Sequence, residues 1–255
     1  MKRRAWPLAL LAPLLVSAEK PTLVPDVSQR DIEIAYSFTG AELLLFGAIL
    51  YPGGRIPDAK DEPAEVVVVV KGPTQSILLR EKQKIAGIWI NAASMRFRSA
   101  PSFYAIASPE PIAKLVDART RAIYELGLDS LQLSPASTAP IAEQTRFAEG
   151  LVDVRHRAGL YVEEPEAVEI TDGVLYRARI AIPARVPVGK FTAETFLIQD
   201  GRVLAAAVRD IDIRKSGFER FVASAAENAS ILYGLTAVVL SVALGWFAGW
   251  VARRI

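Results

Sequence analysis

The sequence predicts a mainly β protein with a helical insertion and one C-terminal transmembrane helix. Strand-like apolar runs occupy residues 19–107 and 160–215, and helical spacing fills residues 108–159 between them. An apolar segment without charged side chains follows at residues 229–252. We expect the two groups of strands to form one discontinuous β-sandwich, with the early strands before the helices and the late strands after them. Two small β-domains separated by the helices are the alternative.

Residues 1–18 have the pattern of a cleavable secretory signal peptide. Basic residues 2–4 precede an apolar run at residues 5–16, and small residues 17–18 precede Glu19. As a helix, this run would reach about 18 Å, which is short of the ~30 Å hydrocarbon core of a bilayer. We therefore expect a mature chain that starts at Glu19. An uncleaved anchor is the alternative.

The early strands are indicated by three apolar runs. Residues 32–38 alternate in polarity, residues 42–50 are a longer apolar run, and residues 65–72 contain five consecutive valines. β-Branched residues disfavour helix, and an unbroken run of them is typical of a central strand that is covered on both faces. The Pro- and Gly-rich residues 51–63 predict a polar loop.

The helical insertion at residues 108–159 is predicted as two amphipathic helices joined by a polar linker at residues 134–140. Each helix has apolar residues spaced by three or four, which places them on one face. In the first helix these are Ile112, Leu115, Val116 and Ile123, and in the second they are Phe147, Leu151 and Val154.

Residues 160–215 predict the late strands of the sandwich. Asp200-Gly201 separates two of the apolar runs and favours a tight hairpin with a primed turn. A strand that ends in Pro183, a Pro-Val-Gly corner at residues 187–189 and Phe191 at the start of the next strand are typical of the last strands of immunoglobulin-like sandwiches. We therefore expect an immunoglobulin-like β-sandwich.

Residues 229–252 predict a membrane-spanning helix. A helix of this length reaches about 36 Å, which is enough to cross a bilayer. Arg253 and Arg254 follow it and favour a cytoplasmic position for residues 253–255. With an exported N-terminus, the bulk of the chain lies in the periplasm and the protein is single-pass in the inner membrane. Residues 216–228 predict a short juxtamembrane amphipathic helix that lies against the membrane or, as the alternative, against the sandwich.

Small residues recur at every fourth position of the predicted membrane helix. They form what we call the small-residue stripe: Ala237, Ser241, Gly245 and Gly249. Small side chains let two helix backbones approach closely, which is a main route to helix association in lipid. The stripe therefore predicts a membrane-protein partner or self-association. The alternative is ordinary composition, because Gly and Ala are frequent in membrane helices.

Composition excludes several kinds of chemistry. The chain has no cysteine, one histidine and two methionines, so thiolate catalysis is impossible and sites built from these ligands are disfavoured. The net charge of +2 depends on basic residues at the two ends, and the region between them is slightly acidic. Nucleic-acid binding needs a dense basic surface. We expect no nucleic-acid partner, no cofactor and no enzymatic activity.

One group of cations stands out within the early strands. Arg80, Lys82 and Lys84 alternate along one run, and Arg96 and Arg98 share the same spacing in the next. If residues 91–94 form a turn, the runs pair antiparallel and all five cations lie on one sheet face. Such a face could attract an anion, an acidic protein loop or lipid headgroups. A solvated strand face is the alternative.

Several segments resemble one family in the same order. They are FTGAELLLFGA, VVVVVKGP, AGIWINAASMRFRSAPSFYAIAS, ARIAIPARVPVGKF and LYGLTAVVL. Together they are similar to the alphaproteobacterial "putative transmembrane protein" family. The resemblance implies a signal peptide, a periplasmic domain and one C-terminal anchor, and it implies association with sulfite-exporter-type permeases.

Two functions follow as hypotheses. The first is a membrane-anchored periplasmic accessory or assembly protein of an inner-membrane complex, with a sulfite-exporter-type permease as the partner that the resemblance implies. The second is a periplasmic binding or sensing module for a small anion, glycan or peptide.

Overall fold

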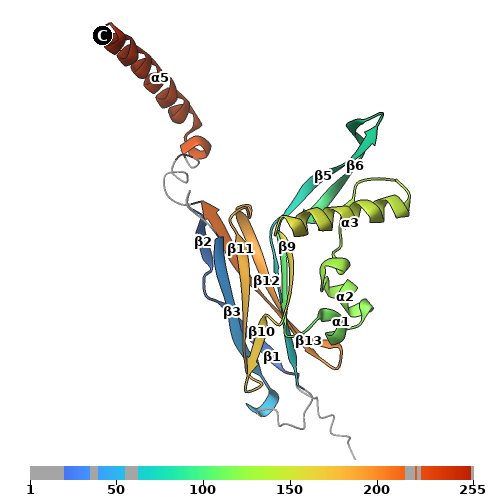
Figure 1. Cartoon of the computed structure of the whole chain (residues 1–255). Coiled ribbons are helices and arrows are strands. Elements are labelled where there is room, and N and C mark those ends of the chain that lie inside the picture. Colours follow the sequence, from blue (N-terminus) through green and yellow to red (C-terminus); the bar gives the residue numbers. More distant parts are fainter. Residues whose placement is uncertain (1–19, 35–39, 55–62, 216–221, 223–224, 254–255) are drawn as a thin grey trace, which may run out of the picture.

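Two β-sheets of unequal size form the body of the protein in a computed structural model (Figure 1), which describes residues 20–34, 40–54, 63–215, 222 and 225–253. The smaller sheet is antiparallel throughout and has the strand order β1-β3-β11-β10. Its strands are β1 (Thr22–Val27), β3 (Gly40–Leu50), β10 (Val168–Thr171) and β11 (Leu175–Pro183). A short 3-10 helix, η1 (Pro52–Gly54), follows β3.

The larger sheet has the strand order β2-β13-β12-β4-β7-β9. Its strands are β2 (Asp31–Ile34), β4 (Glu65–Lys71), β7 (Tyr104–Ser108), β9 (Tyr161–Pro165), β12 (Gly189–Gln199) and β13 (Arg202–Lys215). The pairs β2–β13 and β7–β9 are parallel, and the other pairs are antiparallel. The β12–β13 hairpin turns at Asp200 and Gly201, which both have positive φ as a primed turn requires.

The two sheets enclose one hydrophobic core. The valine run is central in the larger sheet: Val66 to Val70 are all fully buried, and β4 lies between β12 and β7. The sequence prediction of a strand covered on both faces is therefore confirmed. Each sheet combines strands from before and after the helical insertion, as a discontinuous sandwich requires. In two separate β-domains, each sheet would contain strands from one side of the insertion only.

The immunoglobulin-like part of the prediction is not confirmed. Sandwiches of that class are built from antiparallel sheets. Here two parallel pairs, β2–β13 and β7–β9, lie at the two edges of the larger sheet. What the structure supports is a mainly β fold with one C-terminal apolar helix.

The helical insertion covers the outer face of the larger sheet and continues toward a projecting hairpin (Figure 1). It consists of α1 (Ile112–Leu115), α2 (Ala118–Tyr124), η2 (Leu128–Ser130) and α3 (Ile141–Arg157). The first predicted helix is in fact two, because Val116 is extended and Asp117 caps a new helix by accepting a hydrogen bond from the Thr120 N–H. In α3, Phe147 and Leu151 are buried as predicted, whereas Val154 is exposed.

Strands β5 (Thr74–Ile85) and β6 (Ile88–Pro101) form a long hairpin that we call the arm. It forms a third sheet with β8 (Ser134–Pro135). The arm turns at Ala86 and Gly87, so the turn expected at residues 91–94 is wrong. Those residues continue β6 and pair antiparallel with β5, with a register shift opposite Glu81 and Lys82.

The base of the arm is held tightly to the sandwich. The Gly72 N–H donates to the Phe103 carbonyl at 2.8 Å, and the Ser102 N–H donates to the Pro73 carbonyl at 3.0 Å. A Cβ at Gly72 would lie 2.5 Å from the Ser102 Oγ, so only glycine fits without a shift of its neighbours. The arm therefore continues directly from β4 and β7.

Helix α3 packs against one face of the arm. Phe147 and Leu151 pack against Met95, Phe97 and other residues of the arm in a small hydrophobic cluster that is separate from the main core. Arg146 pairs with Glu81 at 3.1 Å at the far limit of this contact. Beyond Glu81 the arm extends past the helix.

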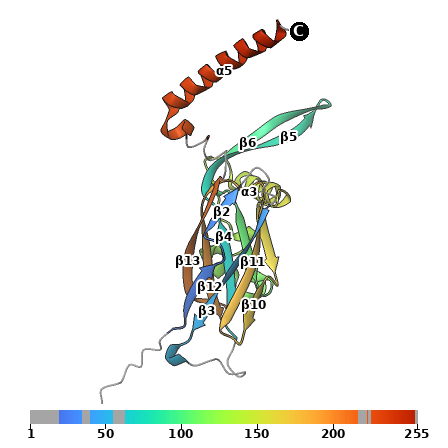
Figure 2. The ribbon, with the colours of Figure 1, turned by 90° about the vertical axis from the view of Figure 1, so that its left-hand side faces the viewer.

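The C-terminal helix α5 (Ser230–Ala252) confirms the predicted apolar segment. Residues Ser230–Val251 are long and apolar enough to cross a membrane, with a mean hydropathy of 2.0. The helix and the arm leave the sandwich at the same end (Figures 1 and 2). The predicted signal peptide and most of the predicted amphipathic helix at 216–228 lie outside the described residues.

Candidate functional site

The arm carries the five cations that the sequence singled out. All five are exposed, and we call them the basic face: Arg80, Lys82, Lys84, Arg96 and Arg98. Leu78 lies opposite Arg96 and Arg80 lies opposite Ser94, which puts these positions on one side of the hairpin. Helix α3 packs on the other side. The face that the sequence pattern described therefore exists as a surface, although its turn lies elsewhere.

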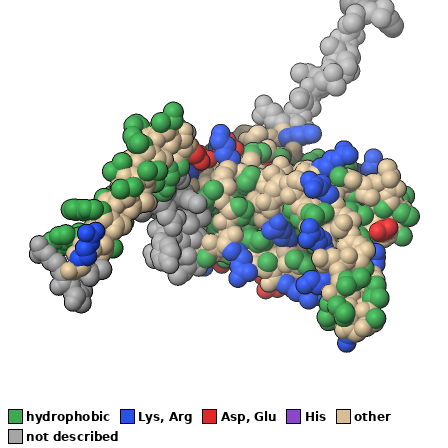
Figure 3. Space-filling model, turned by 90° about the horizontal axis from the view of Figure 1, so that it is seen from above, with side chains coloured by type: hydrophobic (Ala, Val, Ile, Leu, Met, Phe, Trp, Pro, Cys, Tyr) green, Lys and Arg blue, Asp and Glu red, His purple; other side chains and the backbone are tan. Residues whose placement is uncertain are grey.

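The positive charges of the basic face are not neutralised by acidic side chains of the described residues. Among the described residues, none of its five cations forms an ion pair, and Glu81 is engaged by Arg146 on the opposite side of the hairpin. Seen from above, Lys and Arg side chains gather over this part of the molecule (Figure 3). Such a surface attracts anionic partners.

Apolar side chains occupy the end of the arm. We call residues 85–90 the apolar tip: Ile85, Ala86, Gly87, Ile88, Trp89 and Ile90. The exposed fractions are 51% for Ile85, 68% for Ile88, 65% for Trp89 and 43% for Ile90. The sequence analysis missed this feature, although Gly87, between an alternating run and the apolar residues 88–90, is a turn signal that could have revealed it.

Two open cavities flank α3. One, of about 290 Å³, lies between the helix and the arm and is lined by residues such as Leu79, Glu81, Arg146 and Gly150. The other, of about 560 Å³, lies between the helix and the η2 region and includes His156 and Glu149. In the part of the chain that the structure describes, no three His, Asp or Glu side chains are grouped to hold a metal ion.

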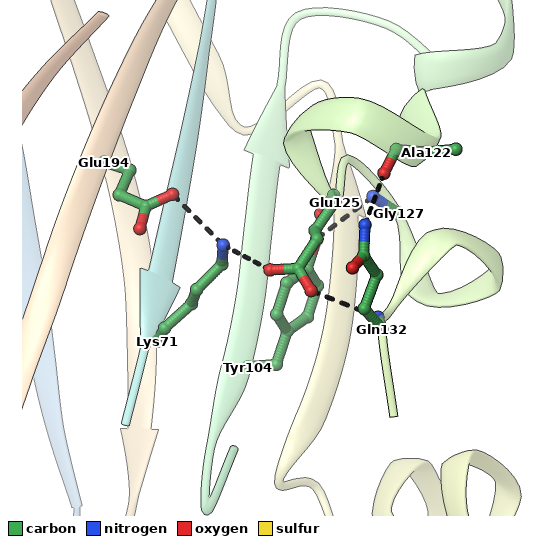
Figure 4. Close-up of polar contacts among 7 residues, drawn as sticks. All are labelled: Lys71, Tyr104, Ala122, Glu125, Gly127, Gln132 and Glu194. Atoms are coloured by element: carbon green, nitrogen blue, oxygen red, sulfur yellow. Dashed lines mark hydrogen bonds and ion pairs between the residues drawn. The ribbon is translucent and has the colours of Figure 1, made fainter. Parts of the chain in front are cut away.

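A polar cluster joins the helical insertion to the larger sheet (Figure 4). Lys71, at the end of β4, contacts the carboxylates of Glu125 at 2.8 Å and Glu194 at 3.1 Å. The Tyr104 hydroxyl donates to the Glu125 carbonyl at 2.6 Å and accepts from the Gly127 N–H at 3.0 Å. Glu125 has positive φ at the end of α2, and these contacts hold it there.

The charges of this cluster indicate a structural role. Burial lowers the pKa of Lys71, but the contacts with Glu125 and Glu194 outweigh it, and the net effect raises that pKa. A lysine held in its charged form is unsuited to act as a nucleophile. We therefore assign the cluster to attachment of α2 on the sheet.

Tyr161 at the foot of the arm makes the stability of the protein sensitive to alkali. Its hydroxyl donates to the Pro101 carbonyl at 2.7 Å, and burial raises its pKa to about 12, against an opposing effect of Arg155. The unfolded chain loses this proton near pH 10. Unfolding is therefore favoured as the pH rises from about 10 to 12, by roughly 2–3 kcal/mol at the upper limit.

We expect Tyr161→Phe to flatten this alkaline loss. The variant starts with a lower free energy of unfolding, by about 1 kcal/mol, because it lacks the hydrogen bond to Pro101. From about pH 10 to 12 its free energy of unfolding should fall by about 2 kcal/mol less than that of the native protein. Urea unfolding at a series of pH values measures both quantities. Parallel curves for the two proteins would contradict the assignment.

The small-residue stripe lies along α5. Ala237, Ser241 and Gly245 are exposed, and nothing lies within 4 Å of a Cβ built at Gly245 or Gly249. The Ser241 hydroxyl donates to the Ala237 carbonyl at 2.8 Å, so it needs no polar partner on another helix. The stripe is a shallow surface that a second helix could approach closely.

Together, a β-rich domain, a projecting arm and one apolar C-terminal helix define a membrane-anchored β protein. The chain belongs to the family described as "Putative transmembrane protein (Alph_Pro_TM)", whose model matches residues 22–254. The resemblance seen in the sequence is thereby confirmed. No curated protein matches the chain.

Among solved structures, one that is similar is Spo0M, a sporulation control protein from Bacillus subtilis. It is 11% identical, with a TM-score of 0.30, and the alignment covers 83% of this chain. The chain spans 56% of the length of that protein. A TM-score of this size does not define a common fold.

Proposed function

We propose that this protein is a non-enzymatic, membrane-anchored accessory or assembly protein of an inner-membrane complex, with its β domain in the periplasm. The observation that carries the proposal is the small-residue stripe on the anchor helix α5. A sulfite-exporter-type permease, which the family resemblance implies, is the first partner to test.

The orientation is supported by the basic residues that end the chain and by the export pattern that begins it. A reporter fused after Ile255 should be active only in the cytoplasm. Activity of that fusion in the periplasm would reverse the orientation and remove the β domain from the periplasm.

The partner contact is tested by Gly245→Leu. The larger side chain holds two helix backbones apart, so co-purification of the partner, or of a second tagged copy, should fall by about tenfold, which corresponds to roughly 1.4 kcal/mol of lost packing. Quantitative mass spectrometry after crosslinking in native membranes measures the loss. The variant should still insert, because Leu favours the span more than Gly does.

Val239→Leu is the control, since it places the same leucine side chain at a position outside the stripe. It should leave co-purification unchanged. If Gly245→Leu behaves like Val239→Leu, the stripe is ordinary membrane-helix composition and the proposal loses its support.

The second candidate is a binding or sensing module for a small anion, glycan or peptide. The unpaired cations of the basic face favour an anion within that range. Thermal unfolding of the full chain in detergent with sulfite, sulfate or phosphate tests it. An unfolding temperature that no anion changes beyond a matched chloride control argues against this candidate.

A further inference from the structure

We propose that the apolar tip of the arm inserts shallowly into the lipid bilayer that α5 spans, with the basic face above anionic headgroups. The protein would then contact the membrane at two places, the anchor helix and the arm. This inference goes beyond the accessory role and does not depend on it.

The first argument is the exposure of the tip on both faces of the hairpin. Ile85 and Ile88 face each other across the turn on the side that α3 covers nearer the base, but the helix contact ends at Glu81. Trp89 lies opposite Lys84 on the other side. Four large apolar side chains, all more than 40% exposed, thus cluster at one point of a domain. Clusters of this kind mark contact surfaces.

The second argument is the position of the tip relative to the anchor. Lys71 of β4 pairs with Thr192, and Thr192 pairs with Asp210 of β13, so β4 and β13 run toward the same end of the larger sheet. The arm begins three residues after Lys71, and the chain that leaves β13 leads to α5. Figures 1 and 2 show both elements leaving that end. The membrane that holds α5 therefore lies on the side toward which the arm points.

The third argument is the chemistry behind the tip. Lys84 and Lys82 precede it by one and three residues, and Arg80 lies on the same face farther from the tip. Trp is enriched at the membrane interface, and Lys side chains near it reach the headgroups. Each cation close to an anionic leaflet adds attraction that falls off within a Debye length. An apolar tip flanked by cations therefore favours contact with a lipid surface over exposure to water.

A second copy of the chain is a poorer occupant of the tip. Two tips that met face to face would bring two basic faces together, and no anion among the described residues of the arm's basic side offsets their repulsion. The bilayer supplies both an apolar layer and, in anionic lipid, the opposite charge.

The absence of cysteine makes a direct test possible. Ile88→Cys in the full chain accepts one environment-sensitive fluorophore at the tip. The protein is placed at one copy per nanodisc, with phosphatidylglycerol in the bilayer and a spin-labelled lipid as quencher at a known depth. We expect a blue-shifted emission that is quenched by a shallow lipid spin label and protected from aqueous iodide.

Leu175→Cys is the matched control. Leu175 is also an exposed apolar residue, but it pairs with Ala48 at the opposite end of the sandwich. The same fluorophore there should be quenched by iodide and not by lipid. If the two labels behave alike, the tip does not enter the bilayer and the proposal is overturned. A blue shift at position 88 without lipid quenching means burial against protein, which also overturns it.

Two further variants separate the apolar and charged contributions. In the Ile88→Cys background, Trp89→Ser should lower the ratio of docked to free tip by about tenfold, the effect expected from losing one large apolar side chain. Lys82→Gln with Lys84→Gln should weaken docking in anionic discs only, and salt should mimic that effect. Docking that neither variant changes would contradict the assignment of the tip.

Discussion

Phe97→Ala should release α3 and the arm while the two large sheets stay folded. Phe97 of β6 is fully buried where the arm packs against α3, within a cluster that is separate from the main core. Removing a buried phenylalanine ring costs about 3–5 kcal/mol through lost burial and the cavity left behind. Because the main core lacks this residue, the cost should appear as local opening.

Hydrogen exchange of the full chain measures this outcome. Amides of β5, β6 and α3 should lose protection in the variant, whereas those of β4, β12 and β13 should keep it. Leu78→Ala is the control, because Leu78 is on the paired strand β5 of the same hairpin but is 45% exposed on the opposite face. Its effect should be below about 1 kcal/mol. A uniform loss of protection in Phe97→Ala would mean that arm and sandwich unfold as one unit.

Lys71→Met should destabilise the protein by about 2–3 kcal/mol. The substitution keeps most of the volume of the side chain but leaves Glu125 and Glu194 without their shared cation (Figure 4). The Lys71 side chain is only 19% exposed, so water replaces the lost contacts poorly. We expect α2, which the cluster fastens, to lose hydrogen-exchange protection first.

Two comparisons test the electrostatic reason. Lys190→Met removes an exposed lysine from the neighbouring strand β12 and should change the free energy of unfolding by less than about 0.5 kcal/mol. Adding Glu194→Gln to Lys71→Met should recover part of the loss, because it removes one of two unpaired carboxylates. If the double variant is less stable than Lys71→Met, packing rather than charge accounts for the effect.

Local patterns were sufficient for the elements that depend on neighbours in the chain. The valine run at 66–70 predicted the central strand, Asp200-Gly201 predicted the β12–β13 hairpin, and the uncharged segment at 229–252 predicted α5. In each case the physical cause lies within a few residues: β-branching, positive φ in a tight turn, or the cost of charge in lipid.

Features that depend on distant partners could not be predicted in this way. The Lys71 cluster joins residues from β4, the end of α2 and β12, and no spacing in the sequence brings them together. The two parallel strand pairs likewise depend on the packing of the whole domain. For the arm, the alternation of cations revealed the basic face, but the β-bulge opposite Lys82 shifted the pattern and hid the position of the turn.

The parallel pairing of β2 with β13 has a consequence for the order in which this protein folds. β13 is the last strand before the anchor, and it lies between β2, from the start of the domain, and β12. The larger sheet therefore stays incomplete during synthesis until nearly the whole chain has emerged. Until then β2 and β12 present unpaired edges, which are templates for aggregation. Contacts of such long sequence separation also form slowly. We therefore expect chaperones to protect newly made chains from aggregation until β13 is in place.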